Sequence, residues 1–271
     1  MEISPVVPLR DGTFVPHVPP RTSLHRRDLG WIRNVLYGAH TLVDCGIFGP
    51  DEPLTTWILE DYEDNLFMAQ DSLSVPDRDW FSRGGVALQP NLVNLFVSYL
   101  ERDQLPQALR AFYNDFAISV YPDVNAFTEW VPTLGIGGGP LYKTSDEAAF
   151  LIWLRLMLVR EDGDRLFLDS GAPRTWLLPG SRIEVNHAAT FYGDVSFRIE
   201  SHLDQGFVEA SVTPPRRNPP RAVILRLRHP QGRHIKRVKL NSQNWLQFDP
   251  DHETVSLPVK EGSVVVRVFY P

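Results

Sequence analysis

The sequence predicts an α+β protein of more than one domain, in which an α-helical block is followed by an antiparallel β-sandwich. Apolar residues recur at helical spacing before residue 165, and from there to residue 271 they alternate as in strands. A glycine-rich turn and one strongly apolar segment stand just before this change of period. We therefore expect an extended arm over residues 1–26, a helical domain over 27–164 and a β-sandwich over 165–271.

The composition argues against nucleic acid and membrane as partners. A net charge of −6 gives no general attraction to polyanions, and no apolar run approaches the roughly 20 residues of a membrane helix. The N-terminus lacks the basic region and apolar core of a signal peptide, so we expect the cytoplasm for the chain as written. Periplasmic or secreted localisation is expected instead if the chain is part of a longer exported protein. Cys45 is the single cysteine and the eight histidines are scattered, so we expect no disulfide, no metal and no cofactor.

The helical block is expected to hold four helices before its glycine-rich turn. Prolines 16, 19 and 20 prevent a helix in the arm. Pro53 is well placed in the first turn of one helix and Pro90 at the start of another. The four helices are expected over about residues 27–45, 52–68, 90–101 and 104–120.

The segment 121–143 is long for a plain connection, and long ordered loops are often functional. It carries Gly135 and Gly137–Gly139, a pattern similar to a dinucleotide fingerprint, but no strand precedes it, so we expect no nucleotide site. In the helix that follows, Thr144 and Glu147 form a T-x-x-E capping box. Its body is apolar on nearly every side, which predicts an inner helix that is buried all round.

From Arg165 onward, alternating apolar residues and recurring turn signals predict six to eight antiparallel strands in a sandwich. We expect this sandwich to support the helical domain, because no row of aromatic residues is spaced as in a binding module. A basic stretch begins at Arg216 and Arg217. It is expected to be a solvated face, with contact to an anionic glycan as the alternative.

Several motifs resemble the C-terminal part of (α/α)6-toroid glycoside hydrolases, and in particular of large bacterial glycosidase-like proteins. One of them is Phe127-Thr128-Glu129-Trp130. The resemblance covers most of the chain, and its motifs are residues 59–65, 84–85, 89–91, 121–123, 127–130, 139–150 and 156–161. It implies a partial toroid followed by a β-sandwich, an oligo- or polysaccharide substrate, and hydrolysis of a glycosidic bond.

A complete toroid has twelve helices, and this chain has room for about half of them. Three alternatives follow: the chain is the C-terminal piece of a longer protein, it completes its ring with a partner such as a second copy, or it has lost the activity. The non-catalytic form of the hypothesis is a fragment that binds glycan or another chain.

Glycoside hydrolysis generally uses two carboxylic acids, one of which must stay protonated near neutral pH. Glu129 fits this demand best, because it stands between Phe127 and Trp130 in a segment that ends in glycines. Under the resemblance it corresponds to the general acid. The alternative is that Glu129 caps a helix or pairs with an arginine.

Asp61 is the candidate for the second carboxylate, as base or nucleophile. It lies four residues after Trp57 and four before Asn65, so these three share one helix face. A carboxylate beside an aromatic and an amide is more typical of a site than one among like charges, and we therefore prefer Asp61 to Glu63. The alternative is a solvated acidic face.

Further residues are candidates for binding the substrate. Aromatic side chains stack on sugar rings, and polar ones donate hydrogen bonds to hydroxyl groups. The candidates are Trp57, Trp80, Trp130, Tyr142, Lys143, Arg83, Gln89 and Asn91. Core packing for the aromatic residues and loop or cap roles for the polar ones are the alternatives.

Overall fold

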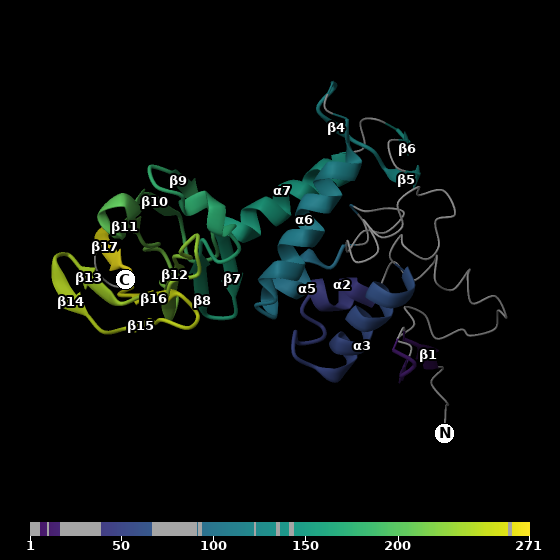
Figure 1. The fold of residues 1–271 in the computed structure, drawn as a ribbon, viewed down its shortest axis with the longest axis horizontal. Helices are drawn as coiled ribbons and strands as arrows, with labels where there is room; N and C mark the ends of the chain where they lie inside the picture. The colour runs from purple at the N-terminus through teal and green to yellow at the C-terminus, as the bar shows by residue number, and fades with distance from the viewer. Residues whose placement is uncertain are drawn as a thin grey trace. The chain divides into compact units, whose positions relative to one another are not determined.

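The computed structural model describes residues 6–9, 11–16, 39–66, 91, 94–121, 123–133, 136–140, 144–259 and 262–271. The chain forms two compact units, Met1–Trp153 and Leu154–Pro271 (Figure 1). The boundary between them falls inside a helix, α7 (Thr144–Leu158). Strand structure begins directly after this helix, six residues before the expected change of period.

The first unit is built on helices and short hairpins. Its other helices are α2 (Ala39–Asp44), α3 (Pro53–Asp61), α5 (Phe96–Glu101) and α6 (Leu105–Ser119), and α3 continues into a π-helical turn, η1 (Tyr62–Leu66). Pro53 stands in the first turn of α3, as predicted. Helix α5 begins later than predicted, because the side-chain oxygen of Asn94 accepts a hydrogen bond from the backbone N–H of Phe96 at 2.9 Å.

The expected loop over 121–143 is replaced in its described part by two small antiparallel hairpins. These are β3 (Val120–Tyr121) with β4 (Ala126–Phe127), and β5 (Trp130–Thr133) with β6 (Ile136–Gly138). The described part of the arm is also a hairpin, β1 (Val6–Pro8) with β2 (Phe14–Pro16). Here the chain pairs its backbone groups locally, a pattern that the apolar spacing did not indicate.

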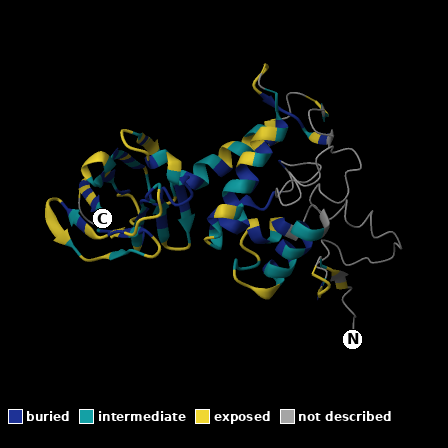
Figure 2. Ribbon diagram, in the orientation of Figure 1, coloured by how far each residue is buried: buried dark blue, intermediate teal, exposed yellow. Residues whose placement is uncertain are grey.

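Aromatic side chains hold α6 and α7 together. Phe112 of α6 is buried and stacks on Phe150 of α7 with ring centroids 4.5 Å apart. The prediction that α7 is buried all round is wrong, because Leu151 and Ile152 are 63% and 55% exposed (Figure 2). A helix with one apolar side facing its neighbours leaves its remaining apolar side chains in solvent. Glu147 also departs from the expected capping box, since its Oε1 accepts a hydrogen bond from the N–H of Phe127 at 3.2 Å.

The second unit contains a six-stranded and a five-stranded sheet. The six-stranded sheet has the order β14-β13-β17-β11-β10-β9. Its strands are β9 (Arg182–Ala188), β10 (Val195–His202), β11 (Phe207–Thr213), β13 (Arg237–Leu240), β14 (Gln243–Trp245) and β17 (Val264–Phe269). The short turns η2 (Arg174–Leu177) and η3 (Leu203–Gln205) connect strands.

The five-stranded sheet has the order β15-β16-β12-β8-β7. Its strands are β7 (Val159–Asp162), β8 (Arg165–Leu168), β12 (Ala222–Arg226), β15 (Phe248–Asp249) and β16 (Thr254–Leu257). Strands β8 and β12 pair in parallel, with Leu168 opposite Leu225. The prediction of a purely antiparallel sandwich is therefore wrong at this pair, and the prediction of six to eight strands is too low.

Both sheets contribute to one hydrophobic core. In β17, Val264, Val266 and Val268 are at most 1% exposed, whereas Val265 between them is 41% exposed. This alternation places every second side chain against the other sheet. Buried residues of the five-stranded sheet, such as Leu166 and Val223, belong to the same cluster.

The mixed α+β class is confirmed, but a toroid is not evident from the described residues. Among them, only α3, α6 and α7 reach nine residues or more. Within the described part of the chain, no helix combines the length and hydropathy needed to cross a bilayer.

Candidate functional site

The hairpin of β5 and β6 holds Glu129 and Trp130 in place. The backbone N–H of Glu129 donates to the carbonyl oxygen of Gly138 at 3.2 Å. The hydroxyl of Thr128 accepts a hydrogen bond from the Gly138 N–H at 2.9 Å and lies within hydrogen-bonding distance of the Trp130 carbonyl. Glu129 is half-buried and Trp130 is 38% exposed, so both side chains are accessible.

Glycines allow these side chains to lie directly on the backbone. A Cβ atom at Gly138 would come within 2.5 Å of the Trp130 indole, and one at Gly139 within 2.4 Å of Glu129 Oε2. Gly139 also has a φ of +86°, which L-residues rarely adopt. The glycine run therefore serves to seat the carboxylate and the indole, and this explains it without a nucleotide.

Asn91 lies beside the same hairpin. It is 3% exposed, and its Nδ2 donates to the carbonyl oxygen of Thr128 at 3.2 Å. Its Oδ1 is buried and accepts no hydrogen bond in the structure. The fold thus brings three predicted site residues together: Asn91, Glu129 and Trp130.

Asp61 and Trp57 lie on helix α3. Asp61 is the last residue of this helix and is 6% exposed, and Trp57 is half-buried one turn earlier. The remaining predicted site residues, Trp80, Arg83, Gln89, Tyr142 and Lys143, lie outside the described residues.

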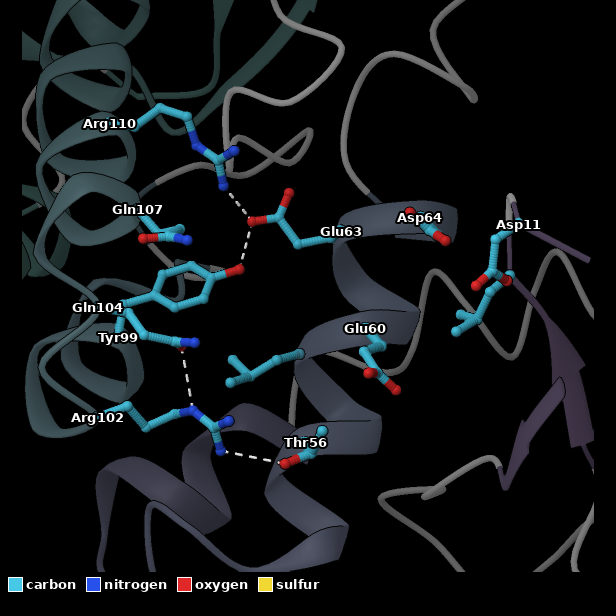
Figure 3. A pocket seen from close by; sticks show the side chains of 12 residues that line it. Asp11, Thr56, Glu60, Glu63, Asp64, Tyr99, Arg102, Gln104, Gln107 and Arg110 are labelled. Carbon is cyan, nitrogen blue, oxygen red and sulfur yellow. Dashed lines mark hydrogen bonds and ion pairs between the residues drawn. The ribbon is translucent and has the colours of Figure 1, made fainter. Parts of the chain in front are cut away.

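A polar cavity of about 510 Å³, which no sequence motif indicates, lies against α3, α5 and α6 (Figure 3). Its carboxylates are Asp11 of the arm and the acidic face of α3 and η1, namely Glu60, Glu63 and Asp64. The lining residues are Leu9, Asp11, Thr56, Leu59, Glu60, Glu63, Asp64, Tyr99, Arg102, Gln104, Gln107 and Arg110.

Glu63 is the best-anchored carboxylate of this cavity. Its Oε1 accepts hydrogen bonds from the Tyr99 hydroxyl and from Arg110 Nη2 (Figure 3). Burial, and to a lesser extent the charge of Glu63, raises the pKa of Tyr99 above its usual value. Tyr99 therefore remains a protonated donor at neutral pH, and Glu63 is held as an acceptor between a phenol and a guanidinium.

The opposite end of the cavity is set by Arg102. Its guanidinium donates to Gln104 Oε1 and Thr56 Oγ1, both at 3.1 Å, and to the carbonyl of Pro50 at 2.7 Å. Glu60 and Gln107 line the cavity without a side-chain hydrogen bond or ion pair in the structure. Planar amide, guanidinium and carboxylate groups of this kind are suited to hydrogen bonding with the hydroxyl groups of a ligand.

The sequence signal that could have found the cavity is the pairing of two stripes. Acidic residues recur at helical spacing within residues 60–64, and Gln107 and Arg110 are spaced in the same way on α6. Each stripe alone is typical of a solvated surface. Only the packing of the helices shows that they face one space.

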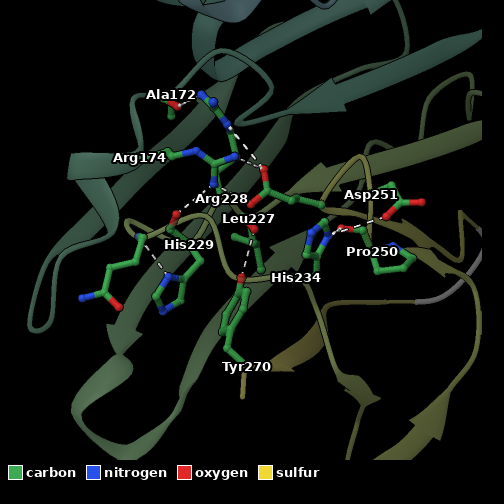
Figure 4. A network of polar contacts seen from close by, with 11 residues as sticks. Ala172, Arg174, Leu227, Arg228, His229, His234, Pro250, Asp251 and Tyr270 are labelled. Carbon is green, nitrogen blue, oxygen red and sulfur yellow. Dashed lines mark hydrogen bonds and ion pairs between the residues drawn. The ribbon is translucent and has the colours of Figure 1, made fainter.

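A second group of charged residues lies at one end of the five-stranded sheet (Figure 4). Arg174 forms a bidentate pair with Glu253, with bonds of 2.5 and 2.7 Å, and donates to the carbonyl of His229 at 2.8 Å. Arg228 Nε lies 3.7 Å from Glu253 Oε2. Asp169 is fully buried, and burial raises its pKa against the opposing effect of Arg228 and Arg226. Glu253 and Arg228 are largely buried, so we interpret this network as support for the sheet.

Among the described residues, no group of three or more histidine, cysteine, aspartate or glutamate side chains is placed to hold a metal ion.

No protein-family model matches this chain, and no curated protein matches it in sequence. The chain has a distant structural similarity to a solved structure described as "Glycoside hydrolase", with a TM-score of 0.37 and 10% sequence identity. The match covers 69% of this chain and 33% of that one, so this chain spans about a third of that protein's length. A likeness at this level assigns no activity.

Proposed function

We propose that this chain is a carbohydrate-active protein that hydrolyses a glycosidic bond, with Glu129 as the general acid and Asp61 as the base or nucleophile. The observation that carries the proposal is the grouping of a carboxylate, an indole and a buried amide at one hairpin, Glu129, Trp130 and Asn91. An indole stacks on a sugar ring, and a carboxylic acid protonates the leaving oxygen. The buried amide of Asn91 positions the hairpin through its hydrogen bond to the Thr128 carbonyl.

The test is Glu129→Gln, assayed by the release of reducing ends from unactivated oligosaccharides. We expect kcat to fall by about 10²- to 10⁴-fold, because the amide cannot protonate the leaving group. Asp123→Asn is the matched control, since it neutralises an exposed carboxylate near the hairpin and should leave kcat unchanged. Full activity in Glu129→Gln removes Glu129 from the mechanism, and an inactive wild-type chain rejects hydrolysis by this chain alone.

A second candidate function is glycan binding without catalysis, and the polar cavity beside α3 favours it. Glu60 and Gln107 offer hydrogen-bonding groups there that the protein does not use itself. We expect Gln107→Ala to weaken oligosaccharide binding about tenfold, the effect of one or two lost hydrogen bonds, as measured by titration calorimetry. Gln231→Ala, at an exposed glutamine of the second unit, is the control. If both variants bind as the wild type does, the cavity is not the binding site.

We also propose that the first unit associates with a second copy or with further helices of its own protein. The observation in support is the exposure of apolar side chains on α6 and α7, namely Tyr113, Phe116, Leu151 and Ile152. Exposed apolar patches commonly mark interfaces.

A further inference from the structure

The second unit contains a cavity of its own, of about 560 Å³. One wall is the end of β9, the connection that follows it and the start of β10. The other is the last residue of β11 and the segment after it. The lining residues are His187, Ala189, Thr190, Gly193, Asp194, Ser196, Thr213, Pro214, Arg216 and Arg217.

Two guanidinium groups dominate the charge of this cavity. Arg216 and Arg217 are exposed, and neither forms a hydrogen bond or ion pair through its side chain in the structure. Asp194 lines the same cavity and is also without an ion pair. Two arginines against one aspartate leave the cavity positive, although the whole chain carries a net charge of −6. The positive charge is therefore local.

Close backbone packing fixes where the Arg217 side chain begins. Gly193 has a φ of +106°, and a Cβ atom there would lie 3.1 Å from the Cβ of Arg217. Only a glycine allows the two walls to approach this closely. Between β9 and β10, the N–H of His187 donates to Ser196 Oγ at 2.9 Å.

Hydroxyl groups line the cavity between the charges. Thr190 Oγ1 donates to the carbonyl of Gly193 at 2.6 Å, and Thr213 Oγ1 lies 2.8 Å from Ser263 Oγ. A hydroxyl has one donor and two acceptor positions, so each keeps capacity for a ligand. The cavity thus combines unpaired guanidinium groups with acceptors for hydroxyl hydrogens.

We propose that this cavity binds an oxyanion group, carboxylate or sulfate, that is carried by a saccharide. Guanidinium groups bind such oxyanions through paired, charge-assisted hydrogen bonds. The side-chain hydroxyls then accept hydrogen bonds from the sugar. The saccharide part of this inference rests on the proposed function, whereas the oxyanion part rests on the charges of the cavity alone.

The test measures binding to the full chain by titration calorimetry with three trisaccharides of equal length. These are a trisaccharide of galacturonic acid, a sulfated galactose trisaccharide and a neutral galactose trisaccharide. We expect at least one charged probe to bind about tenfold or more tightly than the neutral one, and Arg216→Gln and Arg217→Gln each to lose about tenfold in affinity. Which charged probe binds distinguishes a carboxylate site from a sulfate site.

Lys236→Gln is the matched control, because it removes one exposed and unpaired cation elsewhere in the second unit. Equal binding of charged and neutral probes overturns the proposal, and so do arginine variants that bind as the wild type does. An equal loss of affinity in Lys236→Gln overturns the proposal as well, since the charged probe is then not attracted by this cavity in particular. Inorganic sulfate that binds as tightly as the sulfated trisaccharide overturns the saccharide part. Because no turnover is measured, these outcomes are independent of Glu129→Gln.

Discussion

At the scale of single residues, the most consequential titratable group is Asp115 on α6. Its side chain is fully buried, and Ser119 Oγ donates to its Oδ1 at 2.7 Å, while its Oδ2 has no hydrogen-bond partner. Burial, reinforced by the charge of Asp146, raises the pKa of Asp115 from 3.8 to about 7. A carboxyl group with such a pKa is protonated in the folded state at mildly acidic pH.

We expect Asp115 to make the first unit less stable as the pH rises. The folded state binds more protons than the unfolded state between about pH 4 and pH 7, so the free energy of unfolding falls through this window. Asp115→Asn should weaken this dependence, part of which remains because burial also raises the pKa of Asp44 to about 7. It should raise the free energy of unfolding at pH 8 by more than about 1 kcal/mol. Urea unfolding at pH 4.5 and pH 8 checks this, with Asp123→Asn as an exposed control. If the pH dependence of unfolding is unchanged in Asp115→Asn, burial does not raise the pKa of Asp115.

At the scale of elements, the end of the five-stranded sheet shows how pairing gathers distant residues. Strands β8 and β12 run parallel, and β16 is antiparallel to β12. The chain therefore leaves β8 and β12, and enters β16, at the same end of the sheet. This places Asp169, Arg228 and Glu253 together. Glu253 is 6% exposed and its backbone has a φ of +56°, so its partners must hold it in this conformation.

Glu253→Gln should destabilise the second unit by about 2 to 4 kcal/mol, because it removes the buried carboxylate that pairs with Arg174 and lies against the largely buried Arg228. Glu209→Gln is the matched control. Its partner Arg267 is half exposed, and exposed pairs contribute about 1 kcal/mol or less. Urea unfolding followed by tryptophan fluorescence of both variants measures the difference. If both variants lose the same free energy of unfolding, burial of the Glu253 network does not increase its contribution to stability.

At the scale of the whole molecule, the exposed apolar side chains of α7 predict self-association. Leu151→Lys together with Ile152→Lys should weaken association by about tenfold or more, since burying two such side chains contributes several kcal/mol. Light scattering across a concentration series measures this. The matched control is Leu178→Lys with Leu246→Lys, which are exposed apolar residues of the second unit. A wild-type chain that stays monomeric at all concentrations would favour further helices of the same protein as the partner.

Local sequence signals predicted the change from helices to strands and the limits of several elements. Proline marked the start of α3, the apolar spacing gave α6 almost to the residue, and alternation in Val264, Val266 and Val268 gave a strand with one buried face. These features are local, because period and turn chemistry depend on neighbouring residues. For the site, the sequence selected Glu129 and Trp130 and associated them with glycines.

Which elements meet follows from their packing in the fold. The tertiary structure showed the parallel pairing of β8 with β12, the hairpins in place of a loop, and the contact of Asn91 with the Glu129 hairpin. It also showed that the acidic face around Glu63 lines a cavity with Tyr99 and Arg110. Periodicity reports which side of an element is buried but not what buries it, since that depends on packing between residues far apart in the chain. The partners of each face therefore had to come from the fold.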